Sequence, residues 1–313
     1  MLLKNQIDFM GHRRTASLVS GVFIVVSLIS LAFNWLQLGL DFSSGIAVRL
    51  TYSDYVNLDE VHASLSENGY TEALVVSYGS DRDVRIVLPV SQDTQASEQA
   101  SQAIMVGEQL ADQLRQTTES VITLAGSDFV SAKAGQDLAE RSGLGILVAL
   151  GVIMIYISMR FQFKFAVGAV VALLHDVIIT LGIFSVFRLQ FDLTVLAALL
   201  AVIGYSLNDT IIVADRVREN LRRERRGTMV ELVNRSLNQT LSRTLITSGT
   251  TLMVVLSLLL VGSESVRGFC IAMTVGIVAG TYSTIYIASA LLLLMNVQRE
   301  DVALALSEDL GTV

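Results

Sequence analysis

The chain has 313 residues, of which 52% are hydrophobic and only 16% are charged, and its formal net charge is −7. Soluble domains average about 45–50% apolar and about 25% charged residues, so this composition is typical of a membrane protein. The negative charge argues against a nucleic-acid partner. The single cysteine, Cys270, excludes an intrachain disulfide and a cysteine-based metal cluster, and we expect no metal and no cofactor.

Residues 15–36 are predicted to form the first transmembrane helix, after a basic N-terminal segment, 1–14. The stretch from Thr15 to Leu40 holds 26 residues without a charge, and a bilayer core needs about 20 apolar residues in a helix. The stretch is long for a signal peptide and no small-residue cleavage site stands out after it, so we expect it to be retained.

Residues 37–140 are predicted to form a small folded domain outside the membrane, with 16 acidic and 5 basic residues. Hydrophobic periodicity and turn signals predict the order β-α-β-β-α-β, which is the ferredoxin-like α+β pattern. Asn57 followed by Glu60 indicates a variant capping box at the start of the first helix. The expected elements are strand 46–52, helix 57–69, strands 73–78 and 84–88, a helix ending near 116 after a polar, partly linking segment 91–102, and strand 121–124.

A bundle of five further transmembrane helices is predicted in residues 142–298. Three of these stretches are free of charge over 18, 20 and 31 residues, and two contain ionisable groups. A basic cytoplasmic loop, 216–243, carries 8 arginines and 3 acids and joins two of the helices. A cytoplasmic tail, 299–313, follows the bundle. The expected spans are 142–159, 165–187, 193–214, 244–263 and 268–298.

The distribution of lysine and arginine predicts that both termini lie in the cytoplasm. Short cytoplasmic loops are enriched in these residues. With the N-terminus inside, the basic loop 216–243 is cytoplasmic and the acidic domain is outside. The opposite orientation would place the arginine-rich loop outside, and we therefore reject it.

Ionisable groups at membrane depth are costly and usually functional. Asp176 lies at the middle of the predicted third span, and Asp209 lies in the fourth span. Arg243 stands at the cytoplasmic start of the fifth span, which has a hydroxyl-rich first half. The candidate ion-relay residues are Asp209, Arg243 and Asp176, with Asn208, Tyr205 and His175 as supporting neighbours.

Two interpretations of these groups are open. A carboxylate in a medium of low dielectric titrates nearer to neutral pH than in water, so proton uptake can be coupled to a conformational change. One elementary charge crossing about 100 mV supplies about 2.3 kcal/mol for such a change. Alternatively the groups are structural: they pair with one another or cap helix ends, and Arg243 extends to the interface. Asp192 and Asp215, at span ends, are interpreted as ordinary boundary charges.

Small residues recur every four positions along the sixth predicted span, where Gly276 and Gly280 form a GxxxG pair. Small side chains at this spacing let helices approach closely in lipid. We expect this ridge to pack against another helix of the same chain or of a partner. Its members are Gly268, Ala272, Gly276, Gly280, Thr284 and Ala288.

Four segments give the chain a resemblance to the SecF family, and together they extend the resemblance over nearly the whole chain. The run YSLNDTIIVADRVREN is the most specific part. One departure is that Ser44 stands where the family pattern GLDF-[ST]-GG has its first glycine. The segments are GLDFSSG (39–45), RFQFKFAVGAVVALLHDVIITLG (160–182), VIGYSLNDTIIVADRVRENLR (202–222) and RTLITSGTTL (243–252).

The resemblance implies a non-enzymatic subunit of a protein-export complex in the bacterial inner membrane, within the resistance–nodulation–division superfamily. Proteins of this family pair with SecD and assist the export of unfolded polypeptides through the SecYEG channel. The driving force is the proton or sodium motive force, with H⁺ or Na⁺ as the coupling ion. Residue-level matching would place Asp209 and Arg243 in the ion path, at the interface with SecD.

Two alternatives to protein translocation fit the sequence less well. A small-molecule exporter of the same superfamily usually has twelve spans and two large external domains in one chain, and this chain has half of that. An intramembrane enzyme would need a catalytic motif. The sequence has no paired-aspartate protease motif, no HExxH and no serine–histidine arrangement, so we assign no catalytic residue.

Overall fold

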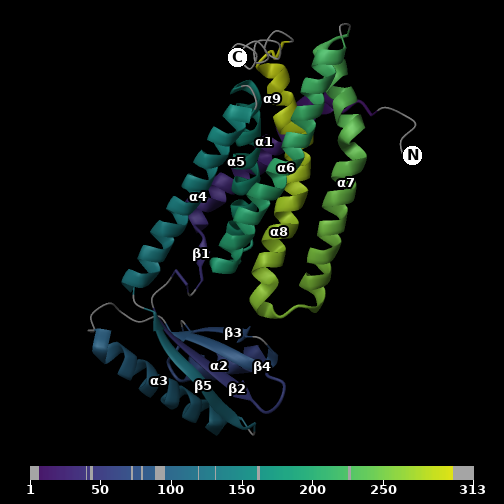
Figure 1. Cartoon of the computed structure of the whole chain (residues 1–313). Helices are drawn as coiled ribbons and strands as arrows, with labels where there is room; N and C mark the ends of the chain where they lie inside the picture. Colours follow the sequence, from purple (N-terminus) through teal and green to yellow (C-terminus); the bar gives the residue numbers. More distant parts are fainter. Residues whose placement is uncertain are drawn as a thin grey trace.

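The computed structural model describes residues 7–298, apart from residues 40, 43–44, 72, 79, 89–95, 119, 131, 161–162 and 225–226. Ser44 and the predicted tail 299–313 therefore lie outside the described residues. The described chain forms a bundle of long helices with a smaller domain at one end (Figure 1). We call residues 45–130 the extramembrane domain.

Six helices of the bundle are long and apolar enough to cross a membrane, as the sequence predicts. The first begins after a single 3-10 turn, and the last contains a π-helical segment. The elements are η1 (Met10–His12), α1 (Arg13–Asn34), α4 (Ala132–Arg160), α5 (Phe163–Val186), α6 (Leu193–Arg223), α7 (Met229–Val261), α8 (Glu264–Ser283), the π-helix η2 (Thr284–Ala288) and α9 (Ser289–Leu294).

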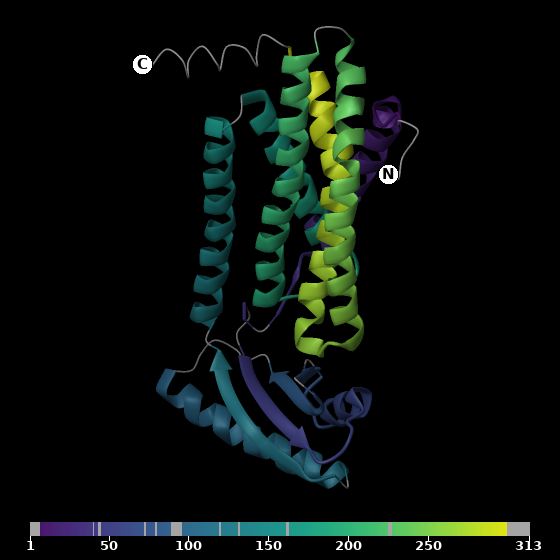
Figure 2. The same ribbon diagram turned by 45° about the vertical axis from the view of Figure 1, so that its right-hand side comes forward.

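The bundle has an inner and an outer set of helices. About half of the apolar stretch is buried in α5 (56%), in α6 (56%) and in the continuous helix from α8 to α9 (50%). The corresponding share is 17% in α1, 17% in α7 and 6% in α4. Figure 2 shows α4 (teal) standing at one side of the bundle. The outer helices therefore present most of their apolar side chains to lipid or to another protein.

The predicted loop 216–243 is helical over most of its length. Helix α6 continues to Arg223 instead of ending at 214, and α7 begins at Met229 instead of 244, so only residues 224–228 connect them. Thr228 and Glu231 form a capping box that begins α7, with each side chain accepting from the other residue's backbone N–H. Ion pairs one turn apart support the extended end of α6, as between Arg223 and Glu219 (2.9 Å).

The extramembrane domain follows the predicted order of elements. Its four strands form one antiparallel sheet in the order β3-β4-β2-β5. The domain ends at Val130, ten residues before the predicted boundary at 140, because the next residues already belong to α4. The elements are β2 (Gly45–Tyr52), α2 (Leu58–Glu67), β3 (Leu74–Tyr78), β4 (Ser80–Leu88), α3 (Ala96–Thr117) and β5 (Ile122–Val130).

Two elements of this domain are longer than the sequence predicts. Helix α3 already begins at Ala96, inside the segment read as a partial linker, and β5 extends to Val130 instead of 124. Strand β5 pairs with the whole of β2, and the register shifts by one residue between Arg49 and Leu50, where a bulge leaves Ala125 without a partner on β2. Both extensions are rich in polar residues, so a prediction based on hydrophobicity missed them.

The predicted helix start at Asn57 is confirmed, with a variation in the bonding. The Asn57 side chain accepts a hydrogen bond from the backbone N–H of Asp59 (3.2 Å). Its amide nitrogen donates to the Glu60 carboxylate (3.0 Å), so Glu60 contacts the side chain of the cap rather than its backbone. Because Asn carries both a donor and an acceptor, it can replace Ser or Thr at this position.

One hydrophobic core joins both helices to one face of the sheet. Alternate residues of β2 and β4 point into this core, as expected for strands with one buried face. Helices α2 and α3 supply most of the remaining buried side chains, so both cover the same face. The core includes Ile46, Val48, Leu50, Val61, Leu65, Val84, Ile86, Leu88, Leu110, Leu114 and Ile122.

The GLDF segment ties the start of the extramembrane domain to the junction of α5 and α6. Strand β1 (Gln37–Leu38) pairs in parallel with β6 (Gln190–Phe191). The Gly39 N–H donates to the Phe191 carbonyl (2.7 Å), and the Asp41 carboxylate accepts from the Leu193 N–H at the start of α6 (3.1 Å). A side chain at Gly39 would press on Asp192, so glycine permits this close approach.

Candidate functional site

Two aspartates are buried among the membrane-crossing helices, and both were predicted from the sequence. Asp176 of α5 is 1% exposed and Asp209 of α6 is 2% exposed. A buried carboxylate needs hydrogen bonds or a counter-charge to offset the loss of hydration. The partners of each carboxylate therefore indicate what it can do.

The Asp176 carboxylate is held by three donors. Ser206 of α6 donates to Oδ2 (2.6 Å), and Ser283 of α8 donates to the same oxygen (2.9 Å). The neighbouring His175 lies with Nδ1 2.9 Å from Oδ1. On the other side of the imidazole ring, Nε2 is 2.5 Å from the Ser20 hydroxyl of α1. This network links four helices around one carboxylate.

The Asp209 carboxylate has far fewer partners. Among the described residues it accepts one long hydrogen bond, from the Ser248 hydroxyl of α7 (3.4 Å). The Ser248 oxygen also lies 2.9 Å from the Thr281 hydroxyl of α8. Asp209 thus sits where α6, α7 and α8 meet, with spare acceptor capacity on both oxygens.

Two unpaired hydroxyls lie one helical turn from this site. The Tyr205 hydroxyl, four residues before Asp209 on α6, is buried without a hydrogen-bond partner in the described part of the chain. The same is true of the Thr244 hydroxyl, four residues before Ser248 on α7. Residues four apart lie on the same helix face. The neighbourhood of Asp209 therefore contains more polar groups than the hydrogen bonds use.

Arg243 does not touch Asp209 in this arrangement. Its side chain is exposed on α7, and it makes no ion pair with any described residue. It precedes Ser248 by five residues, or about 7.5 Å along the helix axis. The structure thus places the predicted pair near each other, on adjacent helices, without joining them.

Asn208 lies on a different side of α6 from Asp209. Its side chain is exposed, and no hydrogen bond joins it to Asp209 among the described residues. Ala201 and Gly204, on preceding turns, are exposed as well, and a side chain at Gly204 would meet no other atom within 4 Å. This face of α6 therefore carries small side chains and one amide, and no described helix of the chain covers it at Gly204.

The glycine ridge packs within the chain rather than against a partner. An added Cβ atom at Gly276 would overlap Val202 of α6, and one at Gly280 would lie 3.0 Å from the Ser206 Cβ atom. The hypothetical Gly280 Cβ would also lie 3.5 Å from Asp176 Oδ2. The predicted GxxxG pair therefore lets α8 approach α6 closely enough for Ser283 to reach Asp176.

Several hydroxyl side chains of the site were not singled out from the sequence. Ser20, Ser206, Thr281 and Ser283 all make side-chain hydrogen bonds inside the bundle. Their only signal in the sequence is a hydroxyl in an otherwise apolar span. No group of three or more His, Cys, Asp or Glu side chains that could hold a metal ion occurs in the described ranges. Asp192 caps α6 by accepting from the Val195 N–H, which fits its interpretation as a boundary charge.

Comparison with known proteins decides the family. A profile of the family "Protein export membrane protein SecD/SecF, C-terminal" matches residues 109–298. The protein translocase subunit SecF of Vibrio alginolyticus is 42% identical over 294 residues, which cover 94% of this chain and 91% of that protein. SecF of Pseudomonas aeruginosa is 43% identical over 296 residues, covering 94% and 93%. The chain belongs to the SecF family.

A solved structure agrees with this assignment. The crystal structure of SecDF from Thermus thermophilus, titled a translocon-associated membrane protein, matches 95% of this SecF-family chain with a TM-score of 0.77 and 34% identity. The chain spans about two fifths (39%) of that SecDF chain. The related SecF proteins are named translocase subunits, so the class of function is transport rather than catalysis. With its six apolar helices, the chain is a multi-pass membrane protein.

Proposed function

We propose that this chain works with a SecD-like subunit and uses the proton or sodium motive force to assist the export of unfolded polypeptides through SecYEG. The observation that carries the proposal is Asp209, a buried carboxylate that accepts one long hydrogen bond among the described residues and lies on the helix next to that of Arg243. Membership of the SecF family supports the same conclusion. The length of the related SecDF chain supports a SecD-like partner, since this chain matches only 39% of it.

In this proposal Asp209 binds and releases the coupling ion. An ionised carboxylate with a single weak donor is poorly stabilised at membrane depth, so a proton or a cation relieves its charge. The Ser248 hydroxyl and the unpaired hydroxyls of Tyr205 and Thr244 can replace part of the hydration of an arriving ion. Thr281 extends this chain of hydroxyls to α8.

Arg243 acts as the alternate counter-charge. When Asp209 is ionised, movement of the Arg243 side chain towards α6 would compensate the charge. When Asp209 is occupied by an ion, Arg243 is free to turn away from it towards the interface or a partner, and its side chain is exposed in this structure. The exposed face of α6 around Asn208 and Gly204 is where we place the SecD-like subunit, because small side chains permit close helix packing in lipid.

Asp176 serves the relay indirectly. Three donors and a linked serine hold its carboxylate in place, so its main role is to fix α1, α5, α6 and α8 around the site. His175 belongs to the same network. A fully bonded carboxylate stabilises one arrangement of helices, whereas an under-bonded one is free to exchange an ion.

The extramembrane domain is proposed to be a ferredoxin-like domain on the periplasmic side, with both chain termini in the cytoplasm. The observed element order and sheet order support the fold. The acidic composition of residues 37–140 and the arginines of residues 216–243, at the opposite end of the bundle, support the orientation (Figure 1).

The test is export of a Sec substrate in cells that carry Asp209→Asn, with the level of the protein in the membrane measured in parallel. We expect normal abundance and loss of nearly all ion-driven stimulation, because asparagine keeps the size of the side chain but cannot take up a proton. Asn208→Ala is the comparison variant on the same helix; it removes no titratable group and should lose less stimulation than Asp209→Asn. Full export by Asp209→Asn at normal abundance would refute the relay.

A second pair of variants tests the counter-charge. Arg243→Ala should lose stimulation to a similar degree as Asp209→Asn. Arg243→Lys should retain part of it, because lysine keeps the positive charge but not the planar, bidentate group of arginine. Full export by both variants would show that the charge at this position is not used.

A further inference from the structure

A pocket opens in the extramembrane domain, away from the membrane-buried residues discussed above. Its volume is about 340 Å³, enough for one or two amino-acid side chains. Its walls come from the end of β2, the segment that leads into α2, one face of α2 and the end of α3. The lining residues are Tyr52, Tyr55, Val56, Asn57, Glu60, Val61, Ala63, Ser64, Glu67, Leu114, Thr117, Thr118 and Ser120.

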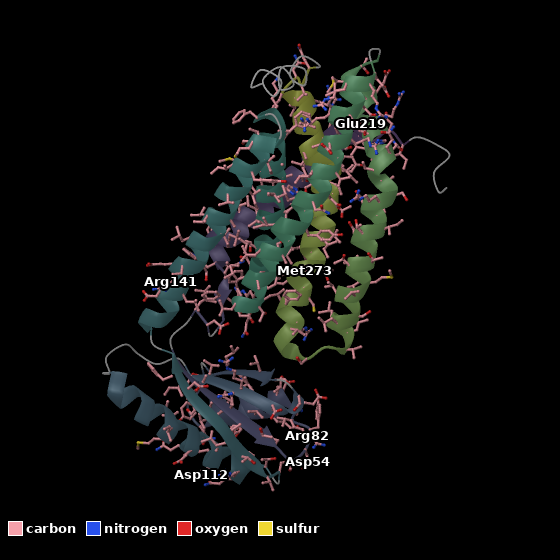
Figure 3. All side chains as sticks on the ribbon, in the orientation of Figure 1. Asp54, Arg82, Asp112, Arg141, Glu219 and Met273 are labelled. Carbon is pink, nitrogen blue, oxygen red and sulfur yellow. The ribbon has the colours of Figure 1, made fainter. Side chains whose placement is uncertain are left out.

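The pocket lies at the end of the domain farthest from the helix bundle. Figure 3 labels Asp54 and Asp112 at the lower end of the domain, away from the membrane helices. Asp54 directly precedes the lining residue Tyr55, and Asp112 lies two positions before the lining residue Leu114. A ligand could therefore approach the pocket from solvent without passing the bundle.

One wall of the pocket is acidic. Glu60, Ser64 and Glu67 of α2 are spaced at i, i+4 and i+7, so they lie along one stripe of the helix. Val61 and Leu65 face the hydrophobic core from the neighbouring stripe. Among the described lining residues there are two carboxylates and no basic side chain. This wall favours a cationic group over an anion.

The pocket also contains an unpaired buried polar atom. Tyr52 is 5% exposed, and its hydroxyl has no hydrogen-bond partner among the described residues. An unpaired buried hydroxyl is unfavourable, and a ligand that bonds to it would remove that penalty. Tyr55 stands nearby with 75% of its surface exposed, so two aromatic rings border the same space.

We propose that this pocket binds a lysine or arginine side chain on an extended segment of the polypeptide that is being translocated. Glu60 and Glu67 would pair with the cationic end, and the faces of Tyr52 and Tyr55 attract a cation through their ring electrons. Val61 and Leu114, at the base, would pack against the methylene stem of the side chain. The Tyr52 oxygen would accept a hydrogen bond from the ligand. The identity of the polypeptide rests on the proposed function.

The experiment uses the full chain in nanodiscs of zwitterionic lipid and three fluorescein-labelled unfolded peptides. The peptides have one Ala/Ser-rich sequence with lysine, norleucine or glutamate at the central position. Fluorescence anisotropy should show the tightest binding for the lysine peptide. The double variant Glu60→Gln/Glu67→Gln should bind the lysine peptide about tenfold more weakly, since each exposed ion pair contributes up to about fivefold.

Matched variants decide whether the pocket is responsible. Glu108→Gln removes the same charge from an exposed position of α3 outside the pocket and should leave binding unchanged. Tyr52→Phe keeps the ring and removes the hydroxyl, and should weaken lysine binding less than the double variant does. Equal binding of the lysine and norleucine peptides, or an equal loss in Glu108→Gln, would overturn the proposal.

The outcome is separable from the test of the ion relay. Asp209→Asn should bind the lysine peptide as the unmodified chain does, because Asp209 lies in the bundle and not in the extramembrane domain. Specific lysine binding together with full export by Asp209→Asn would support the pocket and refute the relay. A photo-crosslinker in place of Tyr55 that captures a SecD-like subunit instead of a translocating polypeptide would assign the pocket to subunit contact and overturn this proposal.

Discussion

The surroundings of Asp176 and Asp209 differ although both carboxylates are almost fully buried in the same bundle. Asp176 accepts from His175, Ser206 and Ser283, whereas Asp209 accepts one long hydrogen bond from Ser248. Burial alone therefore does not identify a working carboxylate. The number of donors from neighbouring helices separates a group that holds a structure together from one that is available to bind an ion.

Removal of the well-bonded carboxylate should have the largest effect on stability. Asp176→Ala leaves the two serine donors and His175 without their acceptor, and buried unpaired groups of this kind cost about 3–5 kcal/mol together. We expect a strong loss of protein from the membrane, and a smaller loss for Asp176→Asn. The measurement is membrane abundance with the unfolding midpoint in detergent. Loss of export at normal abundance would instead assign Asp176 to the ion path.

A change in the spacing of α8 and α6 should have the next largest effect. Gly276→Val places methyl groups where Val202 already lies, and overpacking of a well-filled site costs about 1–3 kcal/mol. Gly204→Val is the matched control on the open face of α6, where no atom lies within 4 Å. Thermal unfolding of the two purified variants should differ clearly, and equal midpoints would contradict the close contact.

The exposed carboxylate of Asp8 should have a smaller effect on stability than the changes above. It serves as a reference for the two buried aspartates because its hydrogen bonds form at the surface. Asp8, before α1, accepts from the Gly11 N–H (2.9 Å) and from Asn234 of α7 (2.7 Å), and these bonds lower the pKa of its carboxyl below 3.8. The contribution to stability is therefore present above pH 3.8 and is lost as the pH falls through the lowered pKa. Carbon-13 NMR titration, assigned with Asp8→Asn, should show this shift. Asn234→Ala should move the pKa back towards 3.8.

The smallest expected effect on stability comes from ionisation of the Tyr52 hydroxyl, and it occurs only at alkaline pH. Burial raises the pKa of Tyr52 to about 12 from the usual value of 10. The folded state therefore favours the neutral phenol, and the associated stability is present below pH 10 and is lost between pH 10 and 12. The difference in ultraviolet absorption between the unmodified chain and Tyr52→Phe measures this titration. A midpoint at the usual value would show that the hydroxyl is solvated.

The sequence predicts the larger features of the fold because they depend on patterns along the chain. The charge-free stretch from Thr15 to Leu40 corresponds to α1, and the Asn57–Glu60 signal correctly begins α2. The arginines of residues 216–243 predict a loop, whereas the structure continues α6 to Arg223 and begins α7 at Met229. Pairs such as Arg216 with Glu219 (2.8 Å), one helical turn apart, were the available signal for helix.

In the candidate site, too, the sequence predicts the residues but not the contacts between their side chains. The positions of Asp176 and Asp209 in apolar spans were enough to select them. Their different roles depend on Ser206, Ser248 and Ser283, which belong to other helices and approach only after the bundle has packed. The partner of the glycine ridge was left open for the same reason, since spacing alone does not say which helix fills the groove.

The strand pair β1–β6 has a mechanical consequence for the molecule. Asp209 follows Leu193 by 16 residues, or about 24 Å along α6. At Leu193 the backbone N–H is held by Asp41, on the segment that leads into the extramembrane domain. The other attachment of that domain is α4, which is only 6% buried. Helix α6 therefore connects Asp209 mechanically to the extramembrane domain. A shift of α6 along its axis at Asp209 must either break the bonds at β1–β6 and Asp41 or move the segment that leads into the domain, while the loosely packed α4 follows.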